Sequence, residues 1–281
     1  MEFIKYDDIK KFADDNLELL LEKEWLNNLM VGNCLEGLEI GTEGWTLAKV
    51  TNENRTELIM LHRRPWHLLL YSPTNNTTDE LFEFTAKEYY KIDNNLNGVN
   101  AEKSLANKFI KYYTKLSNKE AKTNFDMRIL LLENLAKPEL IDDVIFRLAN
   151  SEEKDTLLEF LRIFHIEALG EELEDEALKE RLNNYFEKGY FLLERDGKIV
   201  SQAVIARDLI KGKTISEVFT PKEYRGKGYA YNLIYRISEK MLQEGAEYCV
   251  LYTDDKNPIS NHVYEKVGFK KMVDTADIEF I

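Results

Sequence analysis

The stretch Tyr224-Arg-Gly-Lys-Gly-Tyr-Ala230 decides how this chain folds. It follows a predicted strand at 214–220 and precedes a predicted helix that Gly245 ends. Amides at a helix N-terminus are unpaired, the helix dipole favours an anion there, and glycine lets the backbone approach a phosphate closely. Residues 211–227 also hold five basic and two acidic side chains in a protein that is acidic overall. The loop therefore predicts a pyrophosphate site.

The spacing within the loop excludes two other phosphate motifs. The P-loop needs G-x-x-x-x-G-K-[ST], which this loop does not match. The dinucleotide fingerprint needs a third glycine where this chain has Tyr231 and Asn232. The pattern that fits is R-x-x-G-x-[GA], made by Arg225, Gly228 and Ala230. An ordinary glycine turn with solvated basic side chains is the alternative.

Two further segments carry a resemblance to a known family. The strand before the loop ends in Val218-Phe-Thr-Pro221, and Asn257 lies seven residues before Tyr264, which Gly268-Phe269 follows. With the loop, these segments resemble the GNAT N-acetyltransferase superfamily over about 142–281. Three segments resemble the sequences typical of a tandem two-domain GNAT subfamily with a degenerate N-terminal domain. They are Tyr224–Ala230, Leu251–Asp254 and Ser260–Tyr264.

The resemblance implies an α/β (α+β) fold of two GNAT-like domains, each with a mixed, mostly antiparallel central sheet flanked by helices. Residue patterns in the second half predict an order of elements that matches the GNAT fold. The order is strand, two helices, three strands, helix, strand, helix, and a closing strand pair at 269–273 and 278–281. Asp196-Gly197 between two apolar runs predicts a hairpin within the three strands.

The resemblance also implies an acetyl-CoA site and gives roles to residues. Backbone groups of Val218, Phe219 and Thr220 would hold the pantetheine arm like an added strand, and an amide of this strand would polarise the thioester carbonyl. Asn257 and Asn261 would bond the arm or its phosphates. The pyrophosphate would be bound by the amides and basic side chains of the loop: Arg225, Gly226, Lys227, Gly228, Tyr229 and Ala230.

Two residues are candidates for proton transfer. Amine attack on the thioester expels a thiolate that a phenol can protonate, so Tyr264 is the candidate acid; a packed helix tyrosine is the alternative. Glu217 is a candidate base, although its spacing to the loop is shorter than that of the family's usual glutamate. An exposed strand carboxylate, with a water chain accepting the proton, is the alternative. His165 is interpreted as a surface helix histidine, and His62 and His67 are not expected to form a metal site.

The length of 281 residues predicts two domains, with a boundary at Lys137-Pro-Glu139. Residues 1–137 resemble a degenerate copy of the domain at 138–281, because both are predicted to contain helices, a hairpin and a strand in the same order. The segment 72–80 stands where the phosphate loop should be, yet it has no glycine, lysine or arginine. We therefore expect no cofactor site in the first domain, which would instead complete the substrate cleft, dock the second domain or mediate dimerisation.

We expect an N-acetyltransferase that moves the acetyl group of its co-substrate acetyl-CoA to a primary amine by direct attack in a ternary complex. A non-catalytic acetyl-CoA-binding regulatory or interaction protein is the alternative. Acids outnumber bases 51 to 38, and the net charge of -13 argues against a nucleic-acid partner. A cationic small-molecule or peptide amine is predicted by acids on the helices expected to rim the cleft: Glu167, Glu171, Glu172, Glu174, Asp175 and Glu176.

The two cysteines, Cys34 and Cys249, are far apart and form no C-x-x-C pair, so we expect neither a zinc site nor a disulfide. The opening residues do not resemble a signal peptide, and no apolar run is long enough for a transmembrane helix. These features predict a cytoplasmic protein without a metal or a membrane partner. A homodimer is possible.

Overall fold

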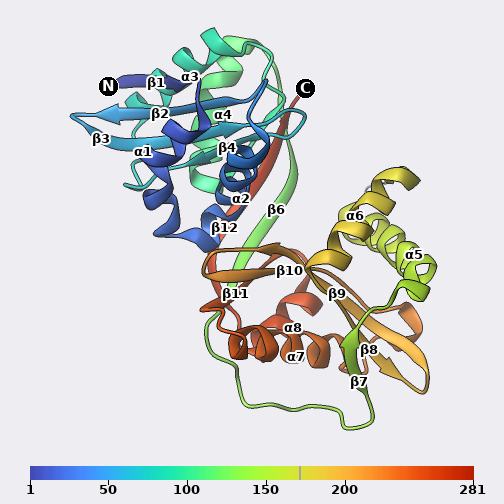
Figure 1. Ribbon diagram of the computed structural model, residues 1–281. Helices are drawn as coiled ribbons and strands as arrows, with labels where there is room; N and C mark the ends of the chain where they lie inside the picture. Colours follow the sequence, from blue (N-terminus) through green and yellow to red (C-terminus); the bar gives the residue numbers. More distant parts are fainter. Residues whose placement is uncertain (171) are drawn as a thin grey trace. The chain divides into compact units, whose positions relative to one another are not determined.

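The computed structural model describes residues 1–170 and 172–281, apart from the side chain of residue 169. They form two compact units (Figure 1): unit 1 comprises Met1–Ile129 with Val273–Ile281, and unit 2 comprises Leu130–Met272. This division differs from the predicted one at 137/138. The reason is that the last strand of the chain pairs within unit 1.

Unit 1 contains a mixed sheet in the order β1-β2-β3-β4-β5-β12-β6. Strands β4 and β5 are parallel, and the other pairs from β1 to β12 are antiparallel. The elements are β1 (Glu2–Tyr6), α1 (Ile9–Leu21), α2 (Glu24–Ile40), β2 (Thr46–Asn52), β3 (Arg55–His62), β4 (Leu68–Tyr71), α3 (Asp79–Ile92), β5 (Gly98–Glu102), α4 (Lys103–Ser117), β6 (Ala121–Leu132) and β12 (Lys270–Phe280).

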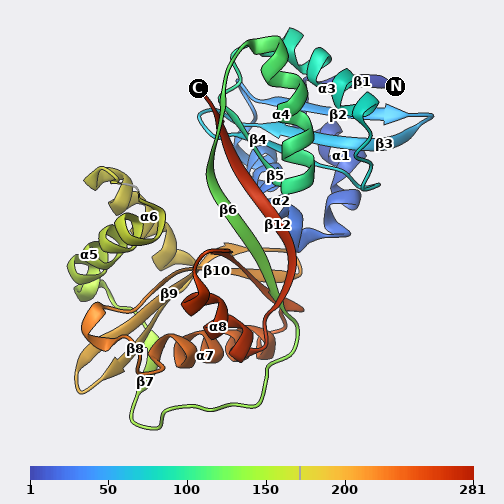
Figure 2. The ribbon, with the colours of Figure 1, turned by 180° about the vertical axis from the view of Figure 1, so that it is seen from behind.

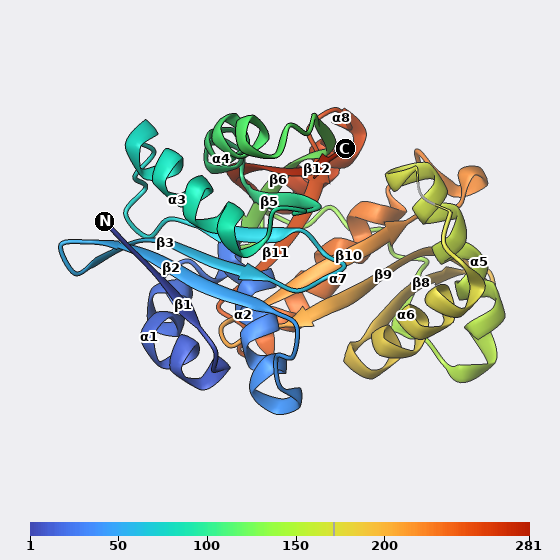
Figure 3. The ribbon, with the colours of Figure 1, turned by 90° about the horizontal axis from the view of Figure 1, so that it is seen from above.

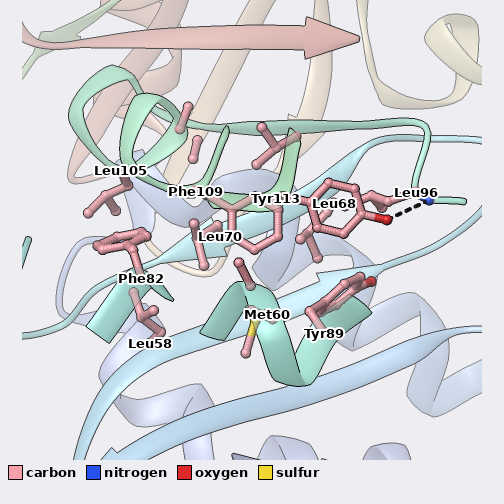
Figure 4. Close-up of a cluster of buried hydrophobic side chains, with 14 of the residues drawn as sticks. Leu58, Met60, Leu68, Leu70, Phe82, Tyr89, Leu96, Leu105, Phe109 and Tyr113 are labelled. Atoms are coloured by element: carbon pink, nitrogen blue, oxygen red, sulfur yellow. Dashed lines mark hydrogen bonds between the residues drawn. The ribbon is translucent and has the colours of Figure 1, made fainter. Parts of the chain in front are cut away.

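The two faces of this sheet bury different helix pairs because successive strand side chains point in opposite directions. Leu58 and Met60 of β3 pack in one core with α3 and α4, while Ile59 and Leu61 pack in the other with α1 and α2. Figure 3 shows the two helix pairs on either side of the strands. In the first core, the Tyr113 hydroxyl accepts from the Leu96 amide at 3.1 Å (Figure 4), so the buried phenol keeps a polar partner.

Unit 2 contains a second sheet in the order β6-β11-β10-β9-β8-β7, of which β6 contributes its last residues. Strands β10 and β11 are parallel, and β7 to β10 pair antiparallel in sequence. Its elements are β7 (Ile145–Leu148), η1 (Ser151–Glu153), α5 (Lys154–Phe164), the π-helix η2 (His165–Leu169), α6 (Asp175–Lys188), β8 (Tyr190–Arg195), β9 (Lys198–Asp208), β10 (Gly212–Phe219), η3 (Lys222–Tyr224), α7 (Tyr229–Gln243), β11 (Tyr248–Asp254) and α8 (Pro258–Val267).

Alternation again separates two cores in unit 2. Tyr190 and Leu192 of β8 pack with helices α5 and α6, whereas Phe191 and Leu193 pack with α7 and α8. Figure 2 shows α7 and α8 beside the strands β8 to β11 of this unit. Each fully buried side chain of this size contributes about 1.5–3 kcal/mol of transfer free energy. Because the side chains alternate, the two faces of this sheet present different sets of residues.

The two halves of the chain repeat one order of regular elements: strand, two helices, three strands, helix, strand, helix, strand. The mixed, mostly antiparallel sheets with flanking helices confirm the predicted fold class. One detail of the prediction is wrong, because the closing strand pair is a single strand, β12. Residues 275–279 of β12 pair with 98–102 of β5, so the strand stays extended across the predicted break.

Among the described residues, no helix combines the length and the apolar character needed to cross a membrane.

Candidate functional site

Strand β10 leaves β11 part of the way along its length. Parallel pairing joins residues 212–214 to 248–250, but β10 continues to Phe219 and β11 continues to Asp254. Beyond residue 214, the edge of β10 that faces β11 forms no ladder with it. An extended ligand can add to such an edge as a strand does, through backbone hydrogen bonds.

A β-bulge interrupts β10 just before it ends. The pairing with β9 shifts register between Ser216 and Phe219, and Glu217 has a φ of 52°. Ser201 of β9 holds the end of the strand, because its hydroxyl donates to the Phe219 carbonyl at 3.1 Å and lies 2.9 Å from the Thr220 hydroxyl. The bulge takes the backbone near Val218 out of the regular ladder.

The glycine loop lies at the N-terminus of the 15-residue helix α7. Gly226 and Gly228 have φ values of 75° and 79°, and Gly228 is the N-cap. Asn232 fastens the loop, donating to the Gly228 carbonyl at 3.0 Å and accepting from the Ile141 amide at 2.7 Å. No described residue accepts a hydrogen bond from the amides of 226–231, which include Tyr229 and Ala230. Amides without an internal acceptor at a helix N-terminus suit an anion such as a pyrophosphate.

The basic side chains of the loop are engaged by other groups of the protein. Arg225 donates to the Thr220 carbonyl at 2.9 Å and to Glu167 at 2.5 Å, and Lys222 lies 3.0 Å from the same carboxylate. Lys227 donates to a carbonyl at 3.0 Å and lies over the Tyr224 ring. The hydrogen bond from Arg225 holds the pKa of Glu167 below its usual value. That Arg225 and Lys227 bind a pyrophosphate stays a prediction.

The contact of Glu167 with the loop was not predicted from the sequence, in which Glu167 is only one acid of the expected cleft rim. It lies on η2, 58 residues before Arg225 in the chain, so no local spacing connects the two.

Helix α8 carries the other predicted cofactor residues. Asn257 caps the helix, accepting from the Ser260 amide at 3.1 Å, and Asn261 donates to the Asp254 carbonyl at 3.2 Å. Both side chains thus support the turn from β11 into α8. The buried Oδ1 of Asn261 has no hydrogen-bond partner among the described residues. Contact of either amide with a cofactor stays a prediction.

Tyr264 lies in the core that α7 and α8 share. Its side chain is 7% exposed and meets the Phe269 ring edge-on, with centroids 6.1 Å apart. Burial raises its pKa, and its hydroxyl makes no hydrogen bond to the described residues. The phenol therefore stays protonated over the neutral range and is available to donate a proton.

Glu217 lies on the opposite face of the sheet from Tyr264. Its carboxylate accepts from the Tyr185 hydroxyl of α6 at 2.9 Å and lies 3.7 Å from His165. Glu217 is 4% exposed, so the alternative of an exposed strand carboxylate is wrong. His165 is 1% exposed, so its interpretation as a surface histidine is wrong too. Burial, with a contribution from Arg181, lowers the pKa of His165 to about 4.

The corresponding region of unit 1 is closed by its own side chains. The carboxylate of Glu57 accepts from Thr74 at 2.6 Å and from Asn76 at 3.1 Å, and Asn76 also caps the Thr78 amide at 3.0 Å. Strand β4 has only four residues, and three of them pair with β5. This loop therefore presents its hydrogen-bond donors to Glu57, and β4 has no long unpaired end.

The histidines of unit 1 bind different partners. His62 lies 3.1 Å from both Asn97 and Tyr89, whereas His67 lies 3.0 Å from Asp277. Nowhere in residues 1–170 and 172–281 do three or more side chains of metal-binding type gather closely enough to hold an ion.

Several acids of the predicted acidic rim are already paired. Glu167 contacts Arg225, Asp175 pairs with Arg162 at 2.9 Å, and Glu176 pairs with Lys179 at 2.8 Å. Glu171 lies outside the described residues. Pairing reduces the field that Glu167, Asp175 and Glu176 project. A cationic acceptor stays a prediction.

Comparisons with known proteins bear on this site. Residues 155–269 match the model of the acetyltransferase (GNAT) family, which spans the bulge, the loop, α7 and α8. No curated protein matches the sequence.

Solved structures resemble the whole chain. An acetyltransferase of the GNAT family from Colwellia psychrerythraea is 13% identical with a TM-score of 0.62, covering 100% of this chain and 99% of its own. A GCN5-related N-acetyltransferase from Sphaerobacter thermophilus is 15% identical with a TM-score of 0.64, covering 99% and 95%. A tandem GNAT protein from the clavulanic acid biosynthesis pathway is 11% identical with a TM-score of 0.55, covering 100% and 98%. At these identities the likeness concerns the fold.

Proposed function

We propose a function from one premise: this chain carries a GNAT acetyltransferase domain at 155–269, and that family uses acetyl-CoA. The protein is an acyltransferase, and the acyl group goes from acetyl-CoA to a primary amine by direct attack in a ternary complex. One observation carries the proposal. Beyond residue 214, β10 forms no ladder with β11, and within a few residues the chain reaches six amides, at 226–231, that donate to no described residue.

The cofactor follows the chain along this segment. The pantetheine arm lies along the free edge of β10 and bonds the backbone of Val218, Phe219 and Thr220, while the pyrophosphate takes the amides of 226–230. A charge-assisted hydrogen bond from an amide to a phosphate is stronger than a neutral one. The bulge turns an amide near Val218 away from β9, so that it can bond the thioester carbonyl oxygen as charge develops there.

Two residues on opposite faces of the sheet move protons. The ammonium form of the acceptor gives a proton to the Glu217 carboxylate, and the freed lone pair forms the new C–N bond. The C–S bond breaks, the CoA thiolate takes the Tyr264 proton, and the surplus proton of the acylated nitrogen passes to the Tyr264 phenolate, which leaves a neutral amide. The buried Glu217 also favours a cationic acceptor, because an ammonium group compensates a carboxylate removed from water.

A turnover screen tests the proposal. The full chain is incubated with acetyl-CoA and polyamines, aminoglycosides, amino acids or peptides, and free CoA thiol is measured. We expect turnover with at least one amine, and fastest turnover with cationic acceptors. Stoichiometric acetyl-CoA binding without turnover on any amine would instead favour a regulatory binding module.

We expect one acetyl-CoA to bind per chain. In unit 2, β10 extends beyond its ladder with β11 into a loop with glycines and basic side chains, whereas the corresponding loop of unit 1 has neither, and its Thr74 and Asn76 donate to Glu57. Isothermal titration calorimetry on the full chain measures the stoichiometry. Two equal sites would contradict the assignment of the cofactor to unit 2 alone.

Glu167→Gln should raise the affinity for CoA by about two- to fivefold, the range of an exposed ion pair. The carboxylate holds Arg225 and Lys222 beside the free amides, and an incoming pyrophosphate must compete with it. Calorimetric titration with CoA measures the change.

The matched control is Glu176→Gln, which removes the same charge from the neighbouring helix without a contact to the loop. An equal rise in both variants would reduce the effect to net charge. A fall in affinity for Glu167→Gln alone would mean that Glu167 orients Arg225 toward the cofactor.

A further inference from the structure

The backbone at Glu217 is held in an uncommon conformation. Glu217 has a φ of 52°, the left-handed region that residues with a Cβ seldom adopt, and it sits within the register shift of β10. Conformations of this kind persist where the surrounding structure imposes them, and they cluster at functional sites. Here the bulge turns an acidic side chain into the core formed with α5 and α6.

The carboxylate is held by an aromatic hydroxyl. Tyr185 of α6 donates to Oε1 of Glu217 at 2.9 Å, and Nε2 of His165 lies 3.7 Å from Oε2. Tyr190 of β8 is directed elsewhere, because its hydroxyl donates to Gln202 at 2.8 Å. Two neighbouring phenols thus have different partners: Tyr185 bonds the Glu217 carboxylate, and Tyr190 bonds the Gln202 amide.

We propose that Tyr185 is a positioning residue, which fixes the Glu217 carboxylate on the α6 side of β10 so that it can accept a proton from the incoming amine. The inference rests on the proposed role of Glu217 as the base. Tyr185 itself does not touch the reacting atoms. It acts by restricting the carboxylate to one orientation and by favouring its charged form, since it donates a hydrogen bond to it.

The ionisable groups known to lie around Glu217 keep one charge state over the pH range of the assay. Burial raises the pKa of Tyr185 and of Tyr190 above the ordinary value. Burial and Arg181 lower the pKa of His165 to about 4, and Arg181 itself is permanently charged. None of these four groups changes charge between about pH 5 and pH 9, the range in which an acetyl-transfer profile is measured. None of these four groups therefore accounts for an acid limb within that range.

Tyr185→Phe tests the inference, because it removes one hydroxyl and keeps the ring. We expect kcat to fall by about tenfold, as for a lost hydrogen bond to a charged group, while KM for acetyl-CoA is unchanged. The acid limb of the pH profile should move to higher pH, since the charged carboxylate loses a donor. Tyr190→Phe is the matched control, because it removes a buried hydroxyl that bonds Gln202 instead.

A double-mutant cycle shows whether the effect passes through Glu217. In the Glu217→Gln background, adding Tyr185→Phe should cause no further loss of kcat. Additive losses, an unmoved acid limb, or equal effects of Tyr185→Phe and Tyr190→Phe would each overturn the proposal and leave Tyr185 as a packing residue.

One measurement does not depend on turnover. With glutamate carrying ¹³C in its carboxyl group, the Glu217 resonance is assigned by its disappearance in Glu217→Gln. It should titrate at higher pH in Tyr185→Phe than in the unsubstituted protein, and at unchanged pH in Tyr190→Phe. A shift without turnover on any amine would mean that the proposed function fails while Tyr185 still holds Glu217. Turnover without a shift would mean that only this inference fails.

Discussion

Tyr264→Phe should lower kcat by about a hundredfold, within the range for loss of a general acid, and leave the affinity for CoA nearly unchanged. The ring packs edge-on against Phe269 and stays in place, while the hydroxyl makes no hydrogen bond to the described residues. Removing it therefore costs little folding stability and removes mainly the proton donor. Steady-state kinetics and calorimetric titration with CoA measure the two quantities separately.

The pH dependence of the unsubstituted protein adds to this test. Tyr264 must be protonated to donate, and burial raises its pKa, so the acid form persists beyond the ordinary value of about 10. We therefore expect no alkaline loss of rate from Tyr264 below that pH. Tyr235→Phe is the matched control, because Tyr235 lies in the same core on α7. Equal kcat for Tyr264→Phe and the unsubstituted protein would make Tyr264 a packing residue.

Gly228→Asp should weaken CoA binding by about a hundredfold, because it places a carboxylate at the cap of α7 beside the phosphates. There is space for a Cβ at this position, since it would meet Ile141 at 3.6 Å and Asn232 at 4.0 Å, both ordinary contacts, but the φ of 79° strains any residue other than glycine. Aspartate also adopts the left-handed backbone of Gly228 more readily than most residues. The affinity is measured by calorimetry, and thermal unfolding checks that the variant remains folded.

Gly228→Asn separates charge from shape. Asparagine has nearly the same volume and the same tolerance for a positive φ but carries no charge, so its loss of affinity should stay within about tenfold. Equal losses in the two variants would mean that the side chain blocks the loop sterically. Unchanged affinity in both would contradict the placement of the pyrophosphate at the N-terminus of α7.

Patterns of neighbouring residues were sufficient to predict several local features of the fold. The glycine loop of 225–230 and the hairpin at Asp196-Gly197 are each specified by neighbouring residues. Turn chemistry and helix capping depend on a few adjacent side chains, so the sequence predicts them directly. The absence of glycine and basic residues in 72–80 likewise predicts a loop without a phosphate site, and this stays a prediction; in the structure, Thr74 and Asn76 of the loop donate to the Glu57 carboxylate.

Other features depend on residues far apart in the chain. The burial of Glu217 against Tyr185, the contact of Glu167 with Arg225, and the pairing of β12 with β5 join segments separated by 32 to more than 100 positions. No periodicity specifies such contacts, because they result from how helices and strands pack once they have formed. The sequence by itself therefore determined the loop, the order of elements and the candidate acid Tyr264. Only the tertiary structure decided the surroundings of the candidate base, because a β-bulge and two packed helices remove Glu217 from water.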